Sequence, residues 1–205
     1  MKRLLVILSL LSLPFLAQAQ GLFFLFPDFV EGHIRFVNRS EEVVRMNFDA
    51  LNQKIFYYEG ETLMELTKPE LISRVEAGGR TFTVRDGLFC EILDREGGKV
   101  LVNWKFKQVN VGSKGALGAT TQAKVEVLNA RSDDVQEIWK QKSDNTYFFM
   151  AGGQEHRIKR LKELYRAFPA QSKQLKAFAK TNKLTMTNAD DAFRLLDYLW
   201  SVLPE

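Results

Sequence analysis

The chain has 205 residues, 45% of them hydrophobic and 16 of them phenylalanine, a composition that excludes a disordered polypeptide and suits one medium domain with a sizeable core. Its formal net charge of +4 falls to +2 once the basic N-terminus described below is removed, so overall basicity indicates no particular partner. One cysteine, Cys90, excludes an internal disulfide, and its apolar neighbours predict a small buried hydrophobic residue.

The N-terminus has the three parts of a secretory signal. A basic pair at positions 2–3 is followed by an apolar stretch over 4–16 and by the small-x-small site Ala17-Gln18-Ala19. We therefore predict that residues 1–19 are a signal peptide and that the mature chain begins at Gln20.

An uncleaved membrane anchor is the alternative for the same segment. Pro14, Gln18 and Gln20 interrupt any apolar span of about 20 residues, which disfavours it. No cysteine near the cleavage site offers a thiol for lipid attachment. We expect an exported protein, periplasmic or secreted, with no transmembrane span after signal cleavage.

The region 20–150 is predicted to be rich in antiparallel strands. From Glu31 onward apolar and polar residues alternate, as in segment 44–49, where Val44, Met46 and Phe48 are expected to share one face. Short glycine turns separate the strands, and tight turns of this kind predict hairpins. We expect a meander of about eight or nine strands, forming a curled sheet, a barrel or a sandwich. The turns are Glu59-Gly60, Gly78-Gly79, Asp86-Gly87 and Gly97-Gly98.

The segment 111–120, VGSKGALGAT, places three glycines at three-residue spacing around Lys114. A phosphate-binding loop needs Gly-Lys-Ser/Thr, and a dinucleotide fingerprint needs G-x-G-x-x-G between a strand and a helix. Neither spacing is present, and the alternation over 123–128 predicts that a strand follows. We predict a long connection from a strand ending near Val109, with a ligand contact through Lys114 as the alternative.

The region 151–205 is predicted to form three helices packed on the sheet, because the apolar period becomes helical after Gly153. The first is expected to begin near His156 and to end at Pro169, which suits the first turn of the next helix. The segment 187–190 resembles a capping box and predicts the start of the third. The fold class is therefore α+β.

Catalytic and metal-binding signatures are absent from the sequence. Its two histidines, His33 and His156, lack any H-E-x-x-H or paired-cysteine context, and no G-x-S-x-G occurs. We predict no catalytic residue, no metal site and no cofactor. The alternative is an envelope hydrolase whose carboxylates meet only in three dimensions, from the set Glu91, Asp94, Asp133 and Asp134.

Residues 155–183 carry a local charge excess of +7. This pattern predicts contact with an anionic partner such as lipopolysaccharide, an acidic glycan or lipid head groups, and its alternative is an ordinary solvated helix surface. Nucleic acid is disfavoured because no base-stacking or helix-turn-helix pattern accompanies the charge. The candidate contact residues are Arg157, Lys159, Arg160, Lys173, Lys176 and Lys180.

Aromatic residues on the predicted strands, together with Lys114, suggest a second kind of site. A curled sheet can enclose an apolar cavity lined by such rings, although core packing alone explains them in most β proteins. The candidate residues for a small apolar ligand are Tyr57, Trp104 and Lys114.

The signal ending AQAQ, the segments EGHIRFVN, VVRMNFD and RTFTV, and the ending LYRAFPAQSKQLKAFAKTNKL resemble uncharacterised exported proteins of Bacteroidota. The likeness covers most of the mature chain but includes no catalytic motif. It implies a protein of the Gram-negative envelope or a secreted protein, and it carries over no site residues. We therefore expect a non-catalytic binding or interaction protein of the bacterial envelope, with the hydrolase above and a structural or assembly protein as the alternatives.

Overall fold

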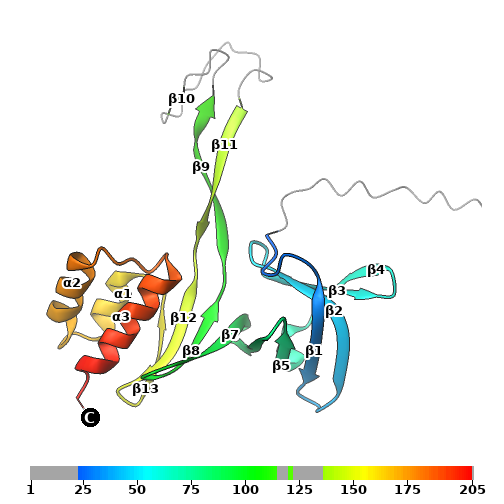
Figure 1. Ribbon diagram of the computed structural model, residues 1–205, viewed down its shortest axis with the longest axis horizontal. Coiled ribbons are helices and arrows are strands. Elements are labelled where there is room, and N and C mark those ends of the chain that lie inside the picture. Colours follow the sequence, from blue (N-terminus) through cyan, green and yellow to red (C-terminus); the bar gives the residue numbers. More distant parts are fainter. Residues whose placement is uncertain (1–22, 115–119, 122–135, 205) are drawn as a thin grey trace, which may run out of the picture.

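The computed structural model describes residues 23–114, 120–121 and 136–204. It confirms the α+β class, with a ten-stranded antiparallel sheet followed by three C-terminal helices (Figure 1). The sheet strands are β1 (Val30–Phe36), β2 (Glu41–Asp49), β3 (Lys54–Glu59), β4 (Thr62–Glu65), β5 (Ile72–Ala77), β6 (Arg80–Arg85), β7 (Leu88–Arg95), β8 (Gly98–Asn103), β12 (Thr146–Ala151) and β13 (Gln154–Ile158). A smaller sheet holds β9 (Phe106–Lys114), β10 (Thr120–Thr121) and β11 (Gln136–Ser143), and the helices are α1 (Leu161–Ala167), α2 (Ser172–Thr181) and α3 (Ala189–Val202).

The ten strands form an open sheet in the order β13-β12-β8-β7-β6-β5-β1-β2-β3-β4. Most neighbours are consecutive hairpins, as the glycine turns predicted. There are two exceptions. Strand β8 pairs with β12, and β5, which follows β4 through a short 3-10 helix (Pro69–Leu71), pairs with β1. Strand β1 therefore lies between β2 and β5, whereas a simple meander would place it at an edge of the sheet.

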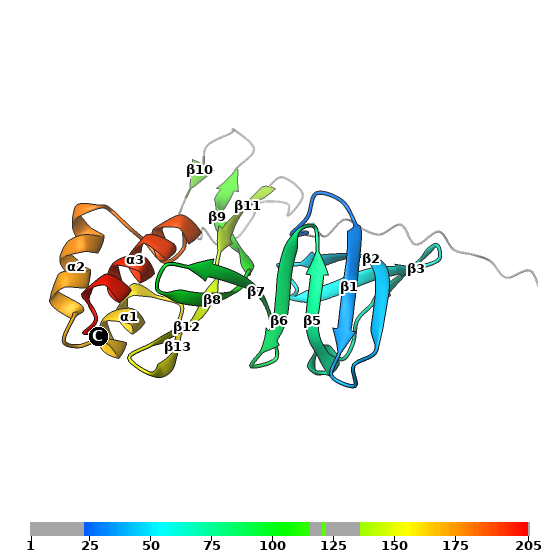
Figure 2. The ribbon, with the colours of Figure 1, turned by 60° about the horizontal axis from the view of Figure 1, so that its bottom comes forward.

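Residues of the large sheet contribute to two separate hydrophobic cores. Each core lies in one of the two lobes of the molecule (Figure 2). In the first lobe, β1–β6 curl around a core that includes Met46, Phe48 and Phe82. In the second lobe, β8, β12 and β13 pack against α1–α3 through residues such as Tyr147 and Leu195. Strand β7 belongs to both lobes, since Phe89 lies in the first core and Leu93 packs against the second.

The segment before β1 covers part of the outer face of β2. Asn47 is fully buried there, because its side-chain oxygen accepts a hydrogen bond from the Phe26 amide (3.1 Å) and its amide donates to the carbonyl oxygens of Phe26 (2.9 Å) and Asp28 (3.0 Å). The alternation predicted for β2 is confirmed for its core face, on which Met46 and Phe48 are buried. The polar face is also buried, at Asn47 and Asp49.

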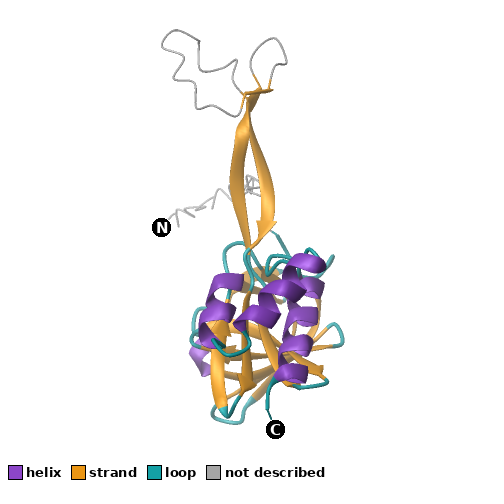
Figure 3. Ribbon diagram, turned by 90° about the vertical axis from the view of Figure 1, so that its left-hand side faces the viewer, coloured by secondary structure: helices purple, strands orange, loops and turns teal. Residues whose placement is uncertain are grey.

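Strands β9 and β11 form a two-stranded arm that extends away from both lobes (Figures 1 and 3). The first part of the glycine run belongs to β9, which continues to Lys114, beyond the predicted end near Val109. Lys114 is paired in register with Thr120 on one side and Gln136 on the other. The predicted strand over 123–128 lies outside the described residues.

The three predicted helices are present, but the first begins later than expected. Residues 154–158 form β13, so His156 lies on the last strand and α1 starts only at Leu161. Gly152 and Gly153 have positive φ angles (57° and 75°) and form the β12–β13 turn rather than a boundary between sheet and helices. The third helix is capped by Asn188, whose side chain accepts a hydrogen bond from the Asp191 amide, one residue later than a capping box led by Thr187 would place it.

Candidate functional site

The basic residues of α1, α2 and the turn that follows α2 form one surface, and Glu163 of α1 accepts hydrogen bonds from the backbone amides of Lys159 and Arg160 rather than pairing with them. Lysines 173, 176 and 180 project from α2 at helical spacings of three and four, on the side opposite the buried Leu175 and Ala179. The Lys176 ammonium lies 5.5 Å from the centroid of the Tyr165 ring on α1, which connects the two helices' surfaces. We call this surface the basic face; its exposed members are Lys162, Arg166, Lys173, Lys176, Lys180 and Lys183.

Within the described part of the chain, no carboxylate lies within 4.0 Å of a charged nitrogen of the basic face. The cations of the sheets are different, since most of those with a described side chain pair with a carboxylate. These paired residues are Arg35, Lys54, Arg74, Arg80, Arg85, Arg95, Lys99, Lys107 and Arg157. The positive charge of α1 and α2 is therefore left to solvent or to a partner.

The candidate contact residues on the N-terminal side of α1 behave differently from those on α2. Arg157 pairs with Asp86 at 3.8 Å and lies over the Phe148 ring, and Lys159 donates to Asp144 at 2.6 Å. Arg160 is exposed at the N-cap of α1. Of the six residues selected from the sequence, Arg157 and Lys159 thus have intramolecular roles, while Arg160 and the three α2 lysines are exposed.

The three ligand-binding candidates do not come together. Tyr57 is half-buried against the core of the first lobe, and Lys114 lies in the arm. Trp104 lies between β8 and β9, where it lines a groove of about 640 Å3 at the base of the arm. The other residues lining the groove are Phe106, Lys142, Ser143, Asn145, Thr187, Asn188 and Ala189.

A hydrogen-bonded network holds Trp104 in place. Its indole nitrogen donates to Oε2 of Glu91 at 2.6 Å, and the same carboxylate accepts from Nε of Arg80 at 2.7 Å. The Arg80 guanidinium lies 5.6 Å from the Trp104 ring centroid and 5.4 Å from that of Phe82. Glu91 was considered as a hydrolytic carboxylate, but its 7% side-chain exposure and its two partners make it a structural anion.

Asp144 connects the arm to the second lobe. Its carboxylate accepts hydrogen bonds from Lys107 of β9 (3.0 Å) and from Lys159 just before α1 (2.6 Å). Burial opposes ionisation of this carboxyl, but the two lysines outweigh it and lower the pKa of Asp144.

We predict that Asp144→Asn lowers the free energy of unfolding at pH 7 by at most about 1 kcal/mol, because both lysines are partly solvated. A lowered pKa in the folded state stabilises the protein above the unfolded-state pKa, and this contribution disappears as the pH falls through the folded-state pKa. Urea denaturation at several pH values should therefore show wild type and variant converging below about pH 4. Asp94→Asn, in the well-exposed pair with Lys99, is the control and should show no such convergence.

The remaining catalytic candidates have ordinary structural surroundings. Cys90 is free and fully buried, and burial raises the pKa of its thiol to about 12, as expected of a buried hydrophobic residue. His33 is exposed on β1 beside Glu31 and Glu41. Asp94 is exposed and pairs with Lys99, while Asp133 and Asp134 lie outside the described residues.

No group of three or more His, Cys, Asp or Glu side chains suited to hold a metal ion is found among the residues that the structure describes. Over the same residues, none of the helices has the length and apolar character needed to cross a membrane. Comparison of the chain with protein-family models, with curated proteins and with solved structures found no match.

Proposed function

We propose that the protein is an exported, non-catalytic binding protein of the bacterial envelope, and that it contacts an anionic partner through the basic face. The observation that carries this proposal is the contrast between the unpaired cations of α1 and α2 and the paired cations of the sheets. A cluster of like charges without counter-charges raises the local concentration of an oppositely charged partner and speeds its encounter with the protein.

The position of the basic face supports the same function. Helix α2 contains three lysines and no acidic residue, and it lies at the outer end of the second lobe, away from the arm and the first lobe (Figure 1). A flat macromolecular surface can therefore approach the basic face without meeting the rest of the molecule.

The envelope is proposed because residues 1–19 are predicted to be a secretory signal and the sequence resembles exported proteins of Bacteroidota. Lipopolysaccharide, acidic glycans and anionic lipid head groups all present phosphate or carboxylate groups in this compartment. Each is chemically suited to lysine ammonium groups, which bind phosphate as point charges.

The test is reversal of Lys173, Lys176 and Lys180 to glutamate in the chain that begins at Gln20. Each basic residue near an anionic surface contributes about 1 kcal/mol, so the triple variant should bind anionic phosphatidylglycerol vesicles and lipopolysaccharide about 100-fold more weakly. Vesicle co-sedimentation and surface plasmon resonance at low ionic strength measure this change.

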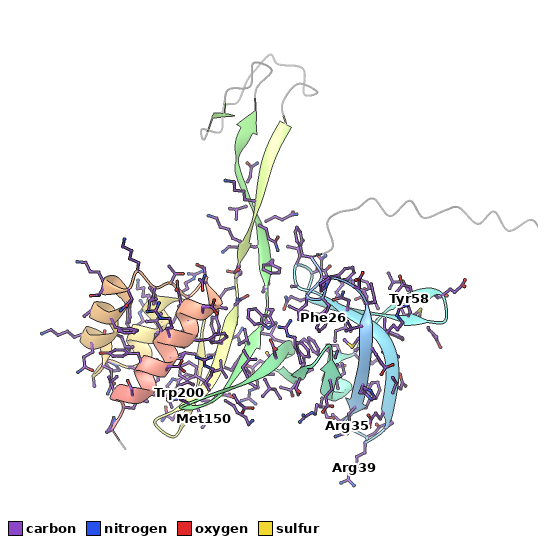
Figure 4. The ribbon with its side chains drawn as sticks, viewed as in Figure 1. Phe26, Arg35, Arg39, Tyr58, Met150 and Trp200 are labelled. Atoms are coloured by element: carbon purple, nitrogen blue, oxygen red, sulfur yellow. The ribbon has the colours of Figure 1, made fainter. Side chains whose placement is uncertain are left out.

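The matched control reverses three exposed cations of the first lobe, Arg39, Arg45 and Lys68, and so makes the same change in net charge. Arg39 lies at the tip of the β1–β2 hairpin (Figure 4), far from α2. This control should bind as the wild type does. If the two variants lose affinity equally, binding depends on the net charge of the protein and not on the basic face. Absence of binding by the wild type would refute the proposal.

A further inference from the structure

The groove at the base of the arm is formed by three segments that are distant in sequence. Trp104 and Phe106 come from the β8–β9 junction, Lys142, Ser143 and Asn145 from the β11–β12 junction, and Thr187, Asn188 and Ala189 from the start of α3. Its volume of about 640 Å3 lies within the range of small-molecule sites. It is separate from the basic face, and nothing in the proposed function uses it.

Contacts with neighbouring residues fix the positions of both aromatic residues of the groove. The Trp104 indole is fixed by its hydrogen bond to Glu91 and by the Arg80 guanidinium, as described above. Phe106 packs against the core of the first lobe, and its backbone amide donates to the Ala50 carbonyl oxygen at 3.0 Å. A ligand would therefore meet rings that are already ordered, which lowers the entropic cost of binding.

Hydrogen-bond donors without intramolecular partners surround these rings. Among the described residues, no acceptor is bonded to the Lys142 ammonium, the Ser143 hydroxyl or the side-chain nitrogen Nδ2 of Asn188. The side-chain oxygen of Asn188 is already used to cap α3. The groove thus combines an aromatic wall with free donors from two other segments.

We propose that this groove binds a saccharide, with one pyranose ring stacked on Trp104 and its hydroxyl oxygens accepting from Lys142, Ser143 and Asn188. A pyranose has an apolar face of C–H groups and a rim of oxygen acceptors, which matches the two kinds of wall. A purely apolar ligand, the class considered from the sequence, would leave these donors without partners on desolvation. The open form of the groove also suits one unit of a longer glycan.

The experiment is isothermal titration of the chain beginning at Gln20 with maltohexaose, cellohexaose, chitohexaose and hexagalacturonate. We expect at least one of them to bind with equimolar stoichiometry. Trp104→Ala should weaken that binding by about tenfold or more, through loss of the stacked ring. Trp200→Ala is the aromatic control, because Trp200 lies at the far end of α3 with Met150, away from the groove (Figure 4), and it should not change the affinity.

Asn188→Asp provides a test that does not depend on the Trp104 network. Aspartate caps a helix as well as asparagine does, so α3 and the melting temperature should be preserved while the amide donor is lost. We expect affinity to fall about fivefold or more. Failure of all four saccharides to bind, or wild-type affinity in both groove variants, would overturn the proposal.

The basic-face variant separates the two proposals. The chain with Lys173, Lys176 and Lys180 reversed should keep its affinity for the saccharide, because none of these residues lines the groove. Loss of saccharide binding in that variant would place the sugar on α2 and refute the groove as its site.

Discussion

Replacing Glu91 with alanine is expected to lower the free energy of unfolding by about 3 kcal/mol, because removal of one member of a buried ion pair leaves the other charge uncompensated. The Arg80 side chain is only 27% exposed and would lose its carboxylate partner. The Trp104 indole N–H would lose its acceptor at the same time. Urea denaturation followed by circular dichroism measures the loss.

Glu155→Ala is the control for this variant. Glu155 also forms a pair with an arginine, Arg85, but both side chains are more than one third exposed, so water can replace the lost interaction. Its denaturation midpoint should stay close to that of the wild type. If Glu91→Ala is no less stable than Glu155→Ala, the pair at the junction of the two lobes does not stabilise the fold.

Replacing Gly78 with alanine is expected to destabilise the protein by about 3 kcal/mol, for two separate reasons. Gly78 has a φ of +56°, which alanine adopts at a cost of about 1 kcal/mol. A Cβ atom at this position would also lie 2.6 Å from Cε1 of Phe26. Phe26 is buried in the first core, so the added methyl group must displace it.

Gly79→Ala isolates the backbone contribution. Gly79 has a similar φ of +73°, but nothing lies within 4 Å of the Cβ that alanine would add. We expect this neighbour to lose only about 1 kcal/mol. Thermal denaturation of both variants measures the difference, and equal losses would mean that Phe26 does not pack against the β5–β6 turn.

Local features of the sequence predicted much of the fold. The alternation in β2 and the glycine turns correctly placed most hairpins, because side-chain period and positive φ are properties of a few adjacent residues. The strand over residues 154–158 was missed because its one apolar residue, Ile158, also fits the helical stripe that follows it. The pairing of β1 with β5 could not be predicted, since it depends on contacts about 40 residues apart.

For the candidate sites too, features that depend on adjacent residues could be predicted from the sequence, and features that depend on long-range contacts could not. Exposure of Lys173, Lys176 and Lys180 follows from the apolar stripe of α2, which their own sequence displays. The partners of Arg157 and Lys159 could not be predicted, because Asp86 and Asp144 reach them only through the folded sheet. Trp104 was selected as an aromatic residue, but its groove is completed by the start of α3, some 80 residues further along the chain.

The place of the arm in the sheet determines how easily its length can change during evolution. It leaves the large sheet after Asn103 and returns at Thr146, and these two residues face each other in the β8–β12 pair. Residues 104–145 are thus an insertion in what is otherwise an ordinary hairpin. Because the entropy of closing a loop grows only with the logarithm of its length, the reach of the arm can lengthen or shorten at little cost to the sheet. The distance over which the protein extends its hairpin is therefore a property that selection can adjust independently of the fold that carries it.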